Sequence, residues 1–395
     1  MPWRGFGLRR LLRRAGSSSL GAGAVFRGTV WTGGEAAPVD GLVIVDGSGR
    51  VDRIGPAAQV AVPEGLPVFG GTGHWIGPGL IDAHVHLAFA AVPPLSTGLV
   101  AVRDLGAPAT VARAVRTGHR RPAEGQPVVA VAGQIVTAPR GYPSATWGRN
   151  GFAAFVADPG QARVVVQGLA TTVDVIKIAL EPGPTGWPVP DPTTVRAVVE
   201  AAHSAGLRVV AHALRAAMVG RAVDAGVDEL AHTPTERLSP DLVERIAAAG
   251  IGVVSTLQTF FSSGHGASAA ANAADLVQAG VDLRYGTDLG NTGTRPGVDP
   301  RELDRLADAG LGRLGALRAA TEAAAAAPGI RGRTGRLRPG EPAALVMLPG
   351  DPLCEPGLWS TVEAVVADGR LLLPAPTAEF AKMGDVHPDR PAVAT

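Results

Sequence analysis

Six side chains of the kinds that bind metal ions or form carbamates lie at or near the ends of apolar, strand-like runs. His84 and His86 follow the run 79–83. In an extended chain residues i and i+2 point to the same face, so both imidazoles can reach one ion. The other four side chains follow later in the sequence and are Lys177, His212, His232 and Asp288.

Lys177 draws attention because this chain uses lysine so rarely. Of its 36 basic residues only two are lysines, Lys177 and Lys382, and all the others are arginines. Lys382 lies in a polar tail, whereas Lys177 lies inside the apolar run 173–180. We therefore expect Lys177 to have a chemical role that arginine cannot fill.

A repeating pattern of strands and helices must position these six side chains. Apolar strand-like runs alternate with alanine-rich helical stretches between residues 76 and 330. The expected strands are 80–83, 99–103, 128–132, 173–179, 208–211, 229–231, 253–256 and 283–285. The expected helices include 159–169, 192–205, 213–225, 240–249, 267–279 and 300–309. This pattern predicts an α/β fold, a (β/α)8 TIM-type barrel whose C-terminal strand ends share one mouth, with a doubly wound sheet as the rival.

Both ends of the chain have a different, β-type pattern. Short runs at 24–31, 41–45 and 50–54 alternate with turns, and similar runs return at 344–348 and 362–366, before a hairpin turn at Asp368-Gly369. We expect segments 24–75 and 331–375 to form one small β-sandwich domain, and 76–330 to form the barrel. Residues 1–23 are predicted to be a basic, poorly ordered arm, and 376–395 a tail.

Composition excludes several other classes of protein. The chain of 395 residues is 46% hydrophobic and 18% charged, so it can bury a large core. Its net charge of +1 gives no support for nucleic-acid binding, and no apolar run approaches the ~20 residues of a membrane-spanning helix. Cys354 is the only cysteine, which excludes a disulfide framework. We expect a cytoplasmic protein that acts on a small molecule, and a homo-oligomer is compatible with this composition.

The motif Gly-Leu-Ile-Asp-Ala-His-Val-His at 79–86 resembles the amidohydrolase superfamily of metal-dependent hydrolases. The four later ligand-type residues occur in the order of that family, and the resemblance covers about residues 24–373. It is closest to the imidazolonepropionase-like and prolidase-like branch, which has a lysine on strand four. One departure is segment 322–328, where alanines replace the usual Asn-Pro-Ala of a helix that packs onto the barrel.

The resemblance implies that CO2 carboxylates Lys177 and that the carbamate bridges two divalent ions. A guanidinium cannot form a carbamate because it stays protonated, whereas a desolvated lysine has its amine form favoured. The resemblance places His84, His86 and Asp288 on the more buried ion, and His212 and His232 on the other. Imidazole and carboxylate ligands favour zinc, with manganese, cobalt and iron as alternatives.

The same resemblance implies hydrolysis of an amide C–N bond. Two ions would activate a shared water as hydroxide, while Asp288 would take its proton and pass it to the leaving group. The expected substrate is an N-acyl amino acid or an Xaa-Pro dipeptide.

Aromatic residues are frequent in the loops after the predicted strands. The candidate substrate contacts are Tyr142, Trp187 and Phe260 for an apolar group, and Arg140 for a carboxylate, with Arg215 as a further arginine near the same mouth. Tyr142 is also a candidate for stabilising an oxyanion.

Three alternatives to amide hydrolysis remain. Lactone or phosphotriester hydrolysis would use the same two-metal chemistry. Hydrolysis or deamination of a cyclic amidine by one ion, as in imidazolonepropionase, would leave Lys177 unexplained. In the purine deaminases of the family a glutamate stands three residues after the strand-five histidine, where this chain has Arg215. A non-catalytic barrel scaffold is the least favoured, because such relatives usually lose their ligands.

Overall fold

The computed structural model describes residues 16–119, 125–330 and 332–373. All eight strands expected between residues 76 and 330 are present, and every pairing between neighbours among them is parallel. They are β6 (Leu80–Val85), β7 (Leu99–Asp104), β8 (Val128–Val131), β11 (Ile176–Ala179), β12 (Val209–His212), β13 (Glu229–Leu230), β14 (Gly252–Val254) and β15 (Leu283–Arg284). These parallel strands and the helices between them confirm the α/β class.

The parallel strands are divided between two sheets. One has the order β6-β7-β8, and the other has the order β10-β9-β11-β12-β13-β14-β15. Two short strands in the second sheet, β9 (Ile135–Thr137) and β10 (Ala153–Phe155), were not expected from the sequence. Backbone hydrogen bonds join the two sheets along both seams, from Asp174 N to Val131 O at 2.8 Å and from Ala83 N to Tyr285 O at 3.0 Å.

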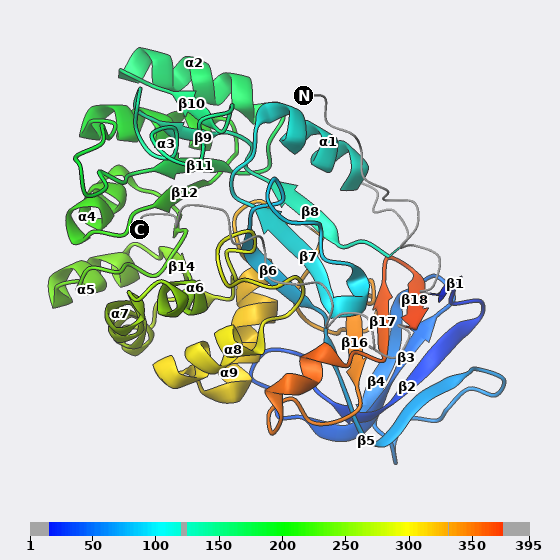
Figure 1. The fold of residues 1–395 in the computed structure, drawn as a ribbon. Coiled ribbons are helices and arrows are strands. Elements are labelled where there is room, and N and C mark those ends of the chain that lie inside the picture. The colour runs from blue at the N-terminus through cyan, green and yellow to red at the C-terminus, as the bar shows by residue number, and fades with distance from the viewer. Residues whose placement is uncertain (1–15, 120–124, 331, 374–395) are drawn as a thin grey trace.

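Helices follow most of the parallel strands and cover their outer side (Figure 1). The α-helices are α1 (Ala109–His119), α2 (Pro159–Ala170), α3 (Pro192–Ser204), α4 (Ala216–Ala225), α5 (Pro240–Ala248), α6 (Leu257–Ser262), α7 (Gly266–Gln278), α8 (Pro300–Leu306) and α9 (Gly312–Arg318). The 3-10 segments are Leu95–Thr97 and Pro356–Ser360, and the π segments are Ala307–Leu311 and Ala319–Ala323.

Local sequence signals explain where several helices begin. Helices α2, α3, α5 and α8 each start with a proline that follows an aspartate or serine, and that polar side chain accepts a hydrogen bond from the first turn. Helix α4 begins at Ala216, three residues later than expected, because the backbone of Arg215 is extended. The helices expected at 159–169, 192–205, 240–249 and 267–279 are confirmed to within a residue at each end.

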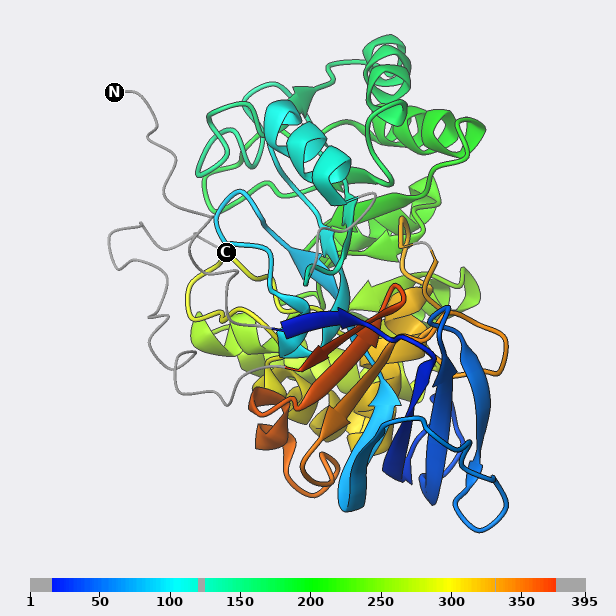
Figure 2. The same ribbon diagram turned by 90° about the vertical axis from the view of Figure 1, so that its right-hand side faces the viewer.

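The strands from the two chain ends form one eight-stranded sheet, in which blue and orange-red strands lie side by side (Figure 1 and Figure 2). Its order is β1-β18-β17-β16-β5-β2-β3-β4. The strands are β1 (Gly16–Ser19), β2 (Gly23–Val30), β3 (Val39–Asp46), β4 (Val51–Pro56), β5 (Val68–Pro78), β16 (Leu345–Leu348), β17 (Ala364–Ala367) and β18 (Arg370–Leu373). The sheet confirms the expected β-type runs at both ends.

Details at the two chain ends refine the expectations. The turn at Asp368-Gly369 joins β17 to β18, and both residues have positive φ, 51° and 76°, as a tight hairpin turn requires. Strand β1 lies within the segment expected to be an arm and pairs with β18. Residues 1–15 of that arm and the expected tail lie outside the described residues.

Two large clusters of buried hydrophobic side chains hold these elements together. One fills the region of the parallel strands and helices, and the other lies within the eight-stranded sheet. Strands β6, β7, β11 and β12 are buried at every residue, so the ends of these strands are held rigidly. No helix in the described part of the chain is long and apolar enough to cross a membrane.

Candidate metal centre

Three of the predicted ligands meet in a buried trio. His84 and His86 lie at the end of β6, and Asp288 lies in the turn that follows β15. His84 Nε2 and His86 Nε2 are 3.2 Å apart, and they lie 3.4 Å and 3.2 Å from Asp288 Oδ1. Asp288 has a positive φ of 56°, a conformation that aspartate tolerates better than most residues. Within the described residues, this trio is the group of histidine and acidic side chains whose ligand atoms lie close enough together to hold a metal ion.

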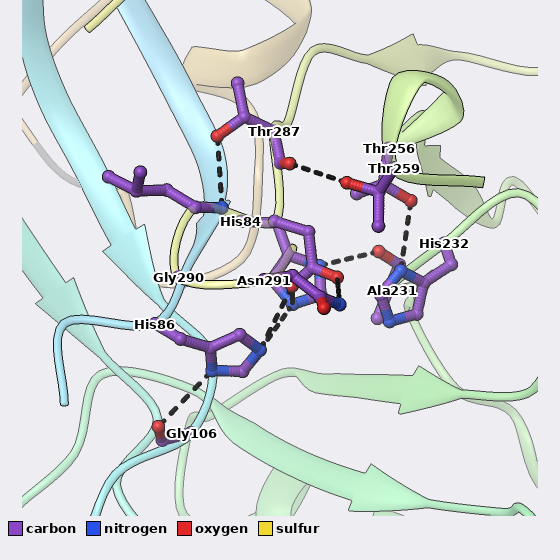
Figure 3. Close-up of polar contacts among 12 residues, drawn as sticks. His84, His86, Gly106, Ala231, His232, Thr256, Thr259, Thr287, Gly290 and Asn291 are labelled. Carbon is purple, nitrogen blue, oxygen red and sulfur yellow. Dashed lines mark hydrogen bonds and ion pairs between the residues drawn. The ribbon is translucent and has the colours of Figure 1, made fainter. Parts of the chain in front are cut away.

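The hydrogen bonds of the two imidazoles determine which of their nitrogens face the trio (Figure 3). His84 Nδ1 donates to Ala231 O at 2.9 Å, and His86 Nδ1 faces Gly106 O at 3.4 Å. In the neutral rings both Nε2 atoms therefore present lone pairs to the carboxylate oxygen. Three such atoms repel one another unless a cation lies among them, so the donor set fits a metal ion. Their separations match the ~3.3 Å between neighbouring ligands of a tetrahedral zinc ion.

The protonation states of these residues also suit a metal ion. Burial lowers the pKa of His84 well below its usual value. Burial alone would raise the pKa of Asp288, but positive charge on the imidazoles of His84 and His86 lowers it well below its usual value, and a cation held among the three groups would favour the carboxylate in the same way. At neutral pH the histidine is therefore neutral and the aspartate ionised, which is how these groups bind cations.

The other two predicted histidines lie beside this trio. The ring of His232 lies 4.6 Å from that of His84, and the ring of His212 lies 4.9 Å from that of His232. His232 Nδ1 contacts Thr256 Oγ1 at 3.0 Å, whereas the buried His212 Nε2 has no hydrogen-bond partner among the described residues. Burial lowers the pKa of His212 well below its usual value and that of His232 to about 3. Both rings are thus neutral and able to bind a cation.

Lys177 lies on β11 and is almost fully buried, at 2% exposure. Burial lowers the pKa of its amine to about 7, and the charge of Arg103 adds to that effect while Asp288 opposes it. A large fraction of the amine is therefore neutral at neutral pH. This neutral form is the one that could react with CO2.

A buried ion-pair network lies in the same interior. Arg103 on β7 and Arg284 on β15 both pair with Glu229 on β13. Arg103 points inward to Glu229, while the adjacent Asp104 accepts a hydrogen bond from Gly106 N at 3.0 Å. The reason is that both residues lie within β7, where successive side chains point to opposite faces.

Asp82 is a supporting residue that sequence reasoning missed. One of its oxygens accepts hydrogen bonds from His84 N and Thr287 N, and the other accepts one from Thr287 Oγ1 at 2.6 Å. This carboxyl therefore ties the end of β6 to the turn that carries Asp288. Burial raises the pKa of Asp82 to about 7. Its place in the motif at 79–86 was the only available signal.

Aromatic side chains form a wall beside the histidines. Tyr142 stacks on His212, with ring centroids 4.8 Å apart, and on Trp187 at 6.0 Å. Phe260 lies 5.7 Å from His232, and Trp147 lies 5.6 Å from His86. Burial raises the pKa of Tyr142, so its hydroxyl stays protonated. The structure thus brings Tyr142, Trp187 and Phe260 to the site.

The two predicted arginines are placed differently from these aromatic rings. Arg140 is exposed in the loop after β9, and no contact within the described residues joins it to the histidines. Arg215 is engaged with the segment after β11, because its Nε lies 3.5 Å from Glu181 Oε1 and its Nη2 donates to Gly183 O at 3.0 Å. Glu181, which sequence reasoning missed, is buried, and its Oε2 lies 3.9 Å from His212 Nε2.

Comparison with known proteins gives the class to which this fold and site belong. A model of the Amidohydrolase family matches residues 75–372, so the chain belongs to this family and is a hydrolase that acts on carbon–nitrogen bonds. No curated protein matches the chain.

Solved structures with a similar fold include several prolidases. A putative prolidase from Bifidobacterium longum is 24% identical with a TM-score of 0.78, covering 92% of this chain and 97% of that one. A Xaa-Pro dipeptidase with bound methionine is 20% identical, with a TM-score of 0.77 and coverage of 89% and 100%. A prolidase complexed with N-methylphosphonate-L-proline is 23% identical, with a TM-score of 0.73 and coverage of 89% and 100%.

Proposed function

We propose that this chain is a binuclear metal-dependent amidohydrolase. The observation that carries the proposal is the convergence of lone pairs from His84, His86 and Asp288 at 3.2–3.4 Å, with His212 and His232 beside them. The first three residues would hold one ion and the last two the other. Lys177, carboxylated by CO2, would contribute to both, and zinc is the metal that best matches this donor set.

The protein's own groups would then perform the acid–base chemistry. Bound divalent ions would supply Lewis acidity and lower the pKa of a nearby water. Asp288, ionised at neutral pH, accepts a proton from the attacking water and returns it to the leaving nitrogen. The hydroxyl of Tyr142, which stays protonated, donates a hydrogen bond to the carbonyl oxygen as negative charge develops there.

The proposed substrate is a small amide with an apolar side chain and a carboxylate, such as an N-acyl amino acid or an Xaa-Pro dipeptide. The aromatic side chains of Tyr142, Trp187 and Phe260 favour a substrate with an apolar group, because that group could pack against their rings. The exposed guanidinium of Arg140 is a candidate for pairing with the carboxylate at the outer end. The fold similarity to prolidases agrees with this class of substrate.

We further propose that the two parallel sheets are the two arcs of one (β/α)8 barrel. The hydrogen bonds along both seams support this closure. Residues 76–330 would form the barrel domain. Residues 24–75 and 331–375 would form the small β-sandwich domain.

The carbamate is tested with Lys177→Ala and, as a matched control, Lys382→Ala, which removes the other lysine of the chain. The wild type and Lys382→Ala should bind about two zinc ions per chain and give a carbamate signal in ¹³C NMR with labelled bicarbonate. Lys177→Ala should lose that signal, bind fewer ions and lose amidase activity. An unchanged signal in Lys177→Ala would refute the carbamate, and preference for uncharged lactones over amides would refute the substrate class.

A further inference from the structure

The hydroxyl of Tyr142 has one hydrogen-bond partner among the described residues, the indole of Trp147. Trp147 Nε1 lies 2.9 Å from Tyr142 Oη. An indole N–H can only donate, so the tyrosine oxygen is the acceptor in this contact. The phenolic hydrogen prefers the plane of the ring and has two orientations there. Because Trp147 occupies one side of the oxygen, the hydrogen of Tyr142 is left to point to the other side.

The same pair of rings connects the two groups of histidines. Tyr142 stacks on His212 with an interplanar angle of 25°, while Trp147 packs edge-on against His86 at a centroid distance of 5.6 Å. The hydrogen bond therefore joins a ring that borders His212 to a ring that borders His86. A substrate carbonyl bound beside His212 would lie next to the ring of Tyr142.

The loop that carries Trp147 is held by its own hydrogen bonds. Pro143 O accepts from Thr146 N at 2.9 Å and from Gly148 N at 3.0 Å. Phe89 and Phe152 stack on each other at 5.2 Å, and both pack edge-on against the indole. The hydrogen bonds of the loop and the contacts with the two phenyl rings hold the indole in place, so its N–H keeps one direction.

We propose that Trp147 is a positioning residue that orients the Tyr142 hydroxyl as a hydrogen-bond donor to the reacting carbonyl. The inference rests on the proposed function and extends it to a residue that does not itself touch the reacting atoms. Trp147 acts by fixing one of the two hydroxyl orientations before the substrate arrives, which removes a cost of ordering during the reaction.

The test is a double-mutant cycle with Trp147→Phe and Tyr142→Phe in the zinc-loaded enzyme. The probe is N-methylphosphonate-L-proline, whose tetrahedral phosphorus imitates the geometry of amide hydrolysis, with binding measured by calorimetry. Trp147→Phe should weaken binding of the probe about tenfold when Tyr142 is present and have little effect in a protein that already carries Tyr142→Phe. For a hydrolysed amide, the same change should lower kcat and leave KM nearly unchanged.

A second substitution removes only the hydrogen-bond donor. Replacement of Trp147 by 3-benzothienylalanine keeps the bicyclic ring but exchanges the N–H for sulfur, so packing is preserved, and it should reproduce the loss of Trp147→Phe. Equal losses with and without the Tyr142→Phe change, or full binding with the benzothienyl residue, would overturn the inference. Failure of the zinc-loaded wild type to bind the phosphonate or to cleave any amide would instead contradict the proposed function.

Discussion

Asp288 combines an unusual backbone with an unusual electrostatic environment. Its left-handed conformation, φ 56°, aims the carboxylate back at His84 and His86. Asn291 Nδ2 donates to Oδ2 at 3.0 Å, which leaves Oδ1 for the imidazole side. A carboxylate fixed in this way and ionised at neutral pH can accept a proton without first being ordered.

Asp288→Asn is the sharpest test of this residue, because asparagine also tolerates the left-handed backbone. The change removes the proton-accepting carboxylate while keeping the shape. We expect kcat for an amide substrate to fall by about 10²–10⁴-fold. The melting temperature, measured alongside, should change little, and a variant that keeps full turnover would contradict the role of Asp288.

Helix α6 shows how a distant element positions part of the site. This short helix carries Phe260 beside His232, yet its N-cap residue, Thr256, makes no side-chain cap. Glu302 on α8 replaces the cap, since its two oxygens accept hydrogen bonds from Leu257 N at 3.0 Å and Gln258 N at 2.6 Å. The position of Phe260 in the aromatic wall therefore depends on the carboxyl group of Glu302, which lies on α8.

Because of Glu302, we also expect the stability of the protein to depend on pH. Burial raises the pKa of its carboxyl from 4.5 to about 7. Between these values the unfolded chain has released a proton that the folded chain retains, so the stability from this group falls as pH rises through the window. The free energy of unfolding, measured with urea, should fall more steeply with pH across this window for the wild type than for Glu302→Gln.

The control for Glu302→Gln is Glu244→Gln, which changes an exposed glutamate on α5. This variant should follow the pH dependence of the wild type. Parallel curves for the wild type and Glu302→Gln would show that Glu302 does not titrate in this window.

The ion pairs of Arg103, Glu229 and Arg284 connect strands in the interior of the molecule. Three strands that are far apart in sequence supply these residues, and Arg103 also donates to Ala83 O and Pro328 O at 2.8 Å. The single carboxylate of Glu229 is thus shared by two guanidiniums inside the core. Burial is the main reason for the lowered pKa of Lys177; the charge of Arg103 adds to this effect, and Glu229 opposes it.

Glu229→Gln should destabilise the protein by about 3–5 kcal/mol, because it leaves the buried Arg103 without an anion and leaves Arg284 with only Asp282, at 3.5 Å. The matched control is Asp224→Asn, which breaks the exposed pair with Arg245 and should cost less than ~1 kcal/mol. Urea unfolding of the two variants measures the difference. Losses of equal size would show that the network is not a main support of the core.

The residue types of the site could be predicted from the sequence because their signals are local. His84, His86 and Asp288 each follow an apolar run, and a few consecutive apolar residues are enough to predict a buried strand. The starts of several helices were also readable, since an aspartate or serine before a proline caps a helix without help from distant residues. The start of α4 and the strands β9 and β10 were not, because long-range packing decides them.

The sequence by itself determined most of the strands, the starts of several helices and the types of residue at the candidate site, because each depends on neighbours a few positions away. Only the tertiary structure decided which atoms meet. Arg103 forms an ion pair with Glu229 rather than with the adjacent Asp104, and Trp147 donates a hydrogen bond to the hydroxyl of Tyr142. Such pairings depend on the register of parallel strands and on the path of a loop, and no local pattern encodes either.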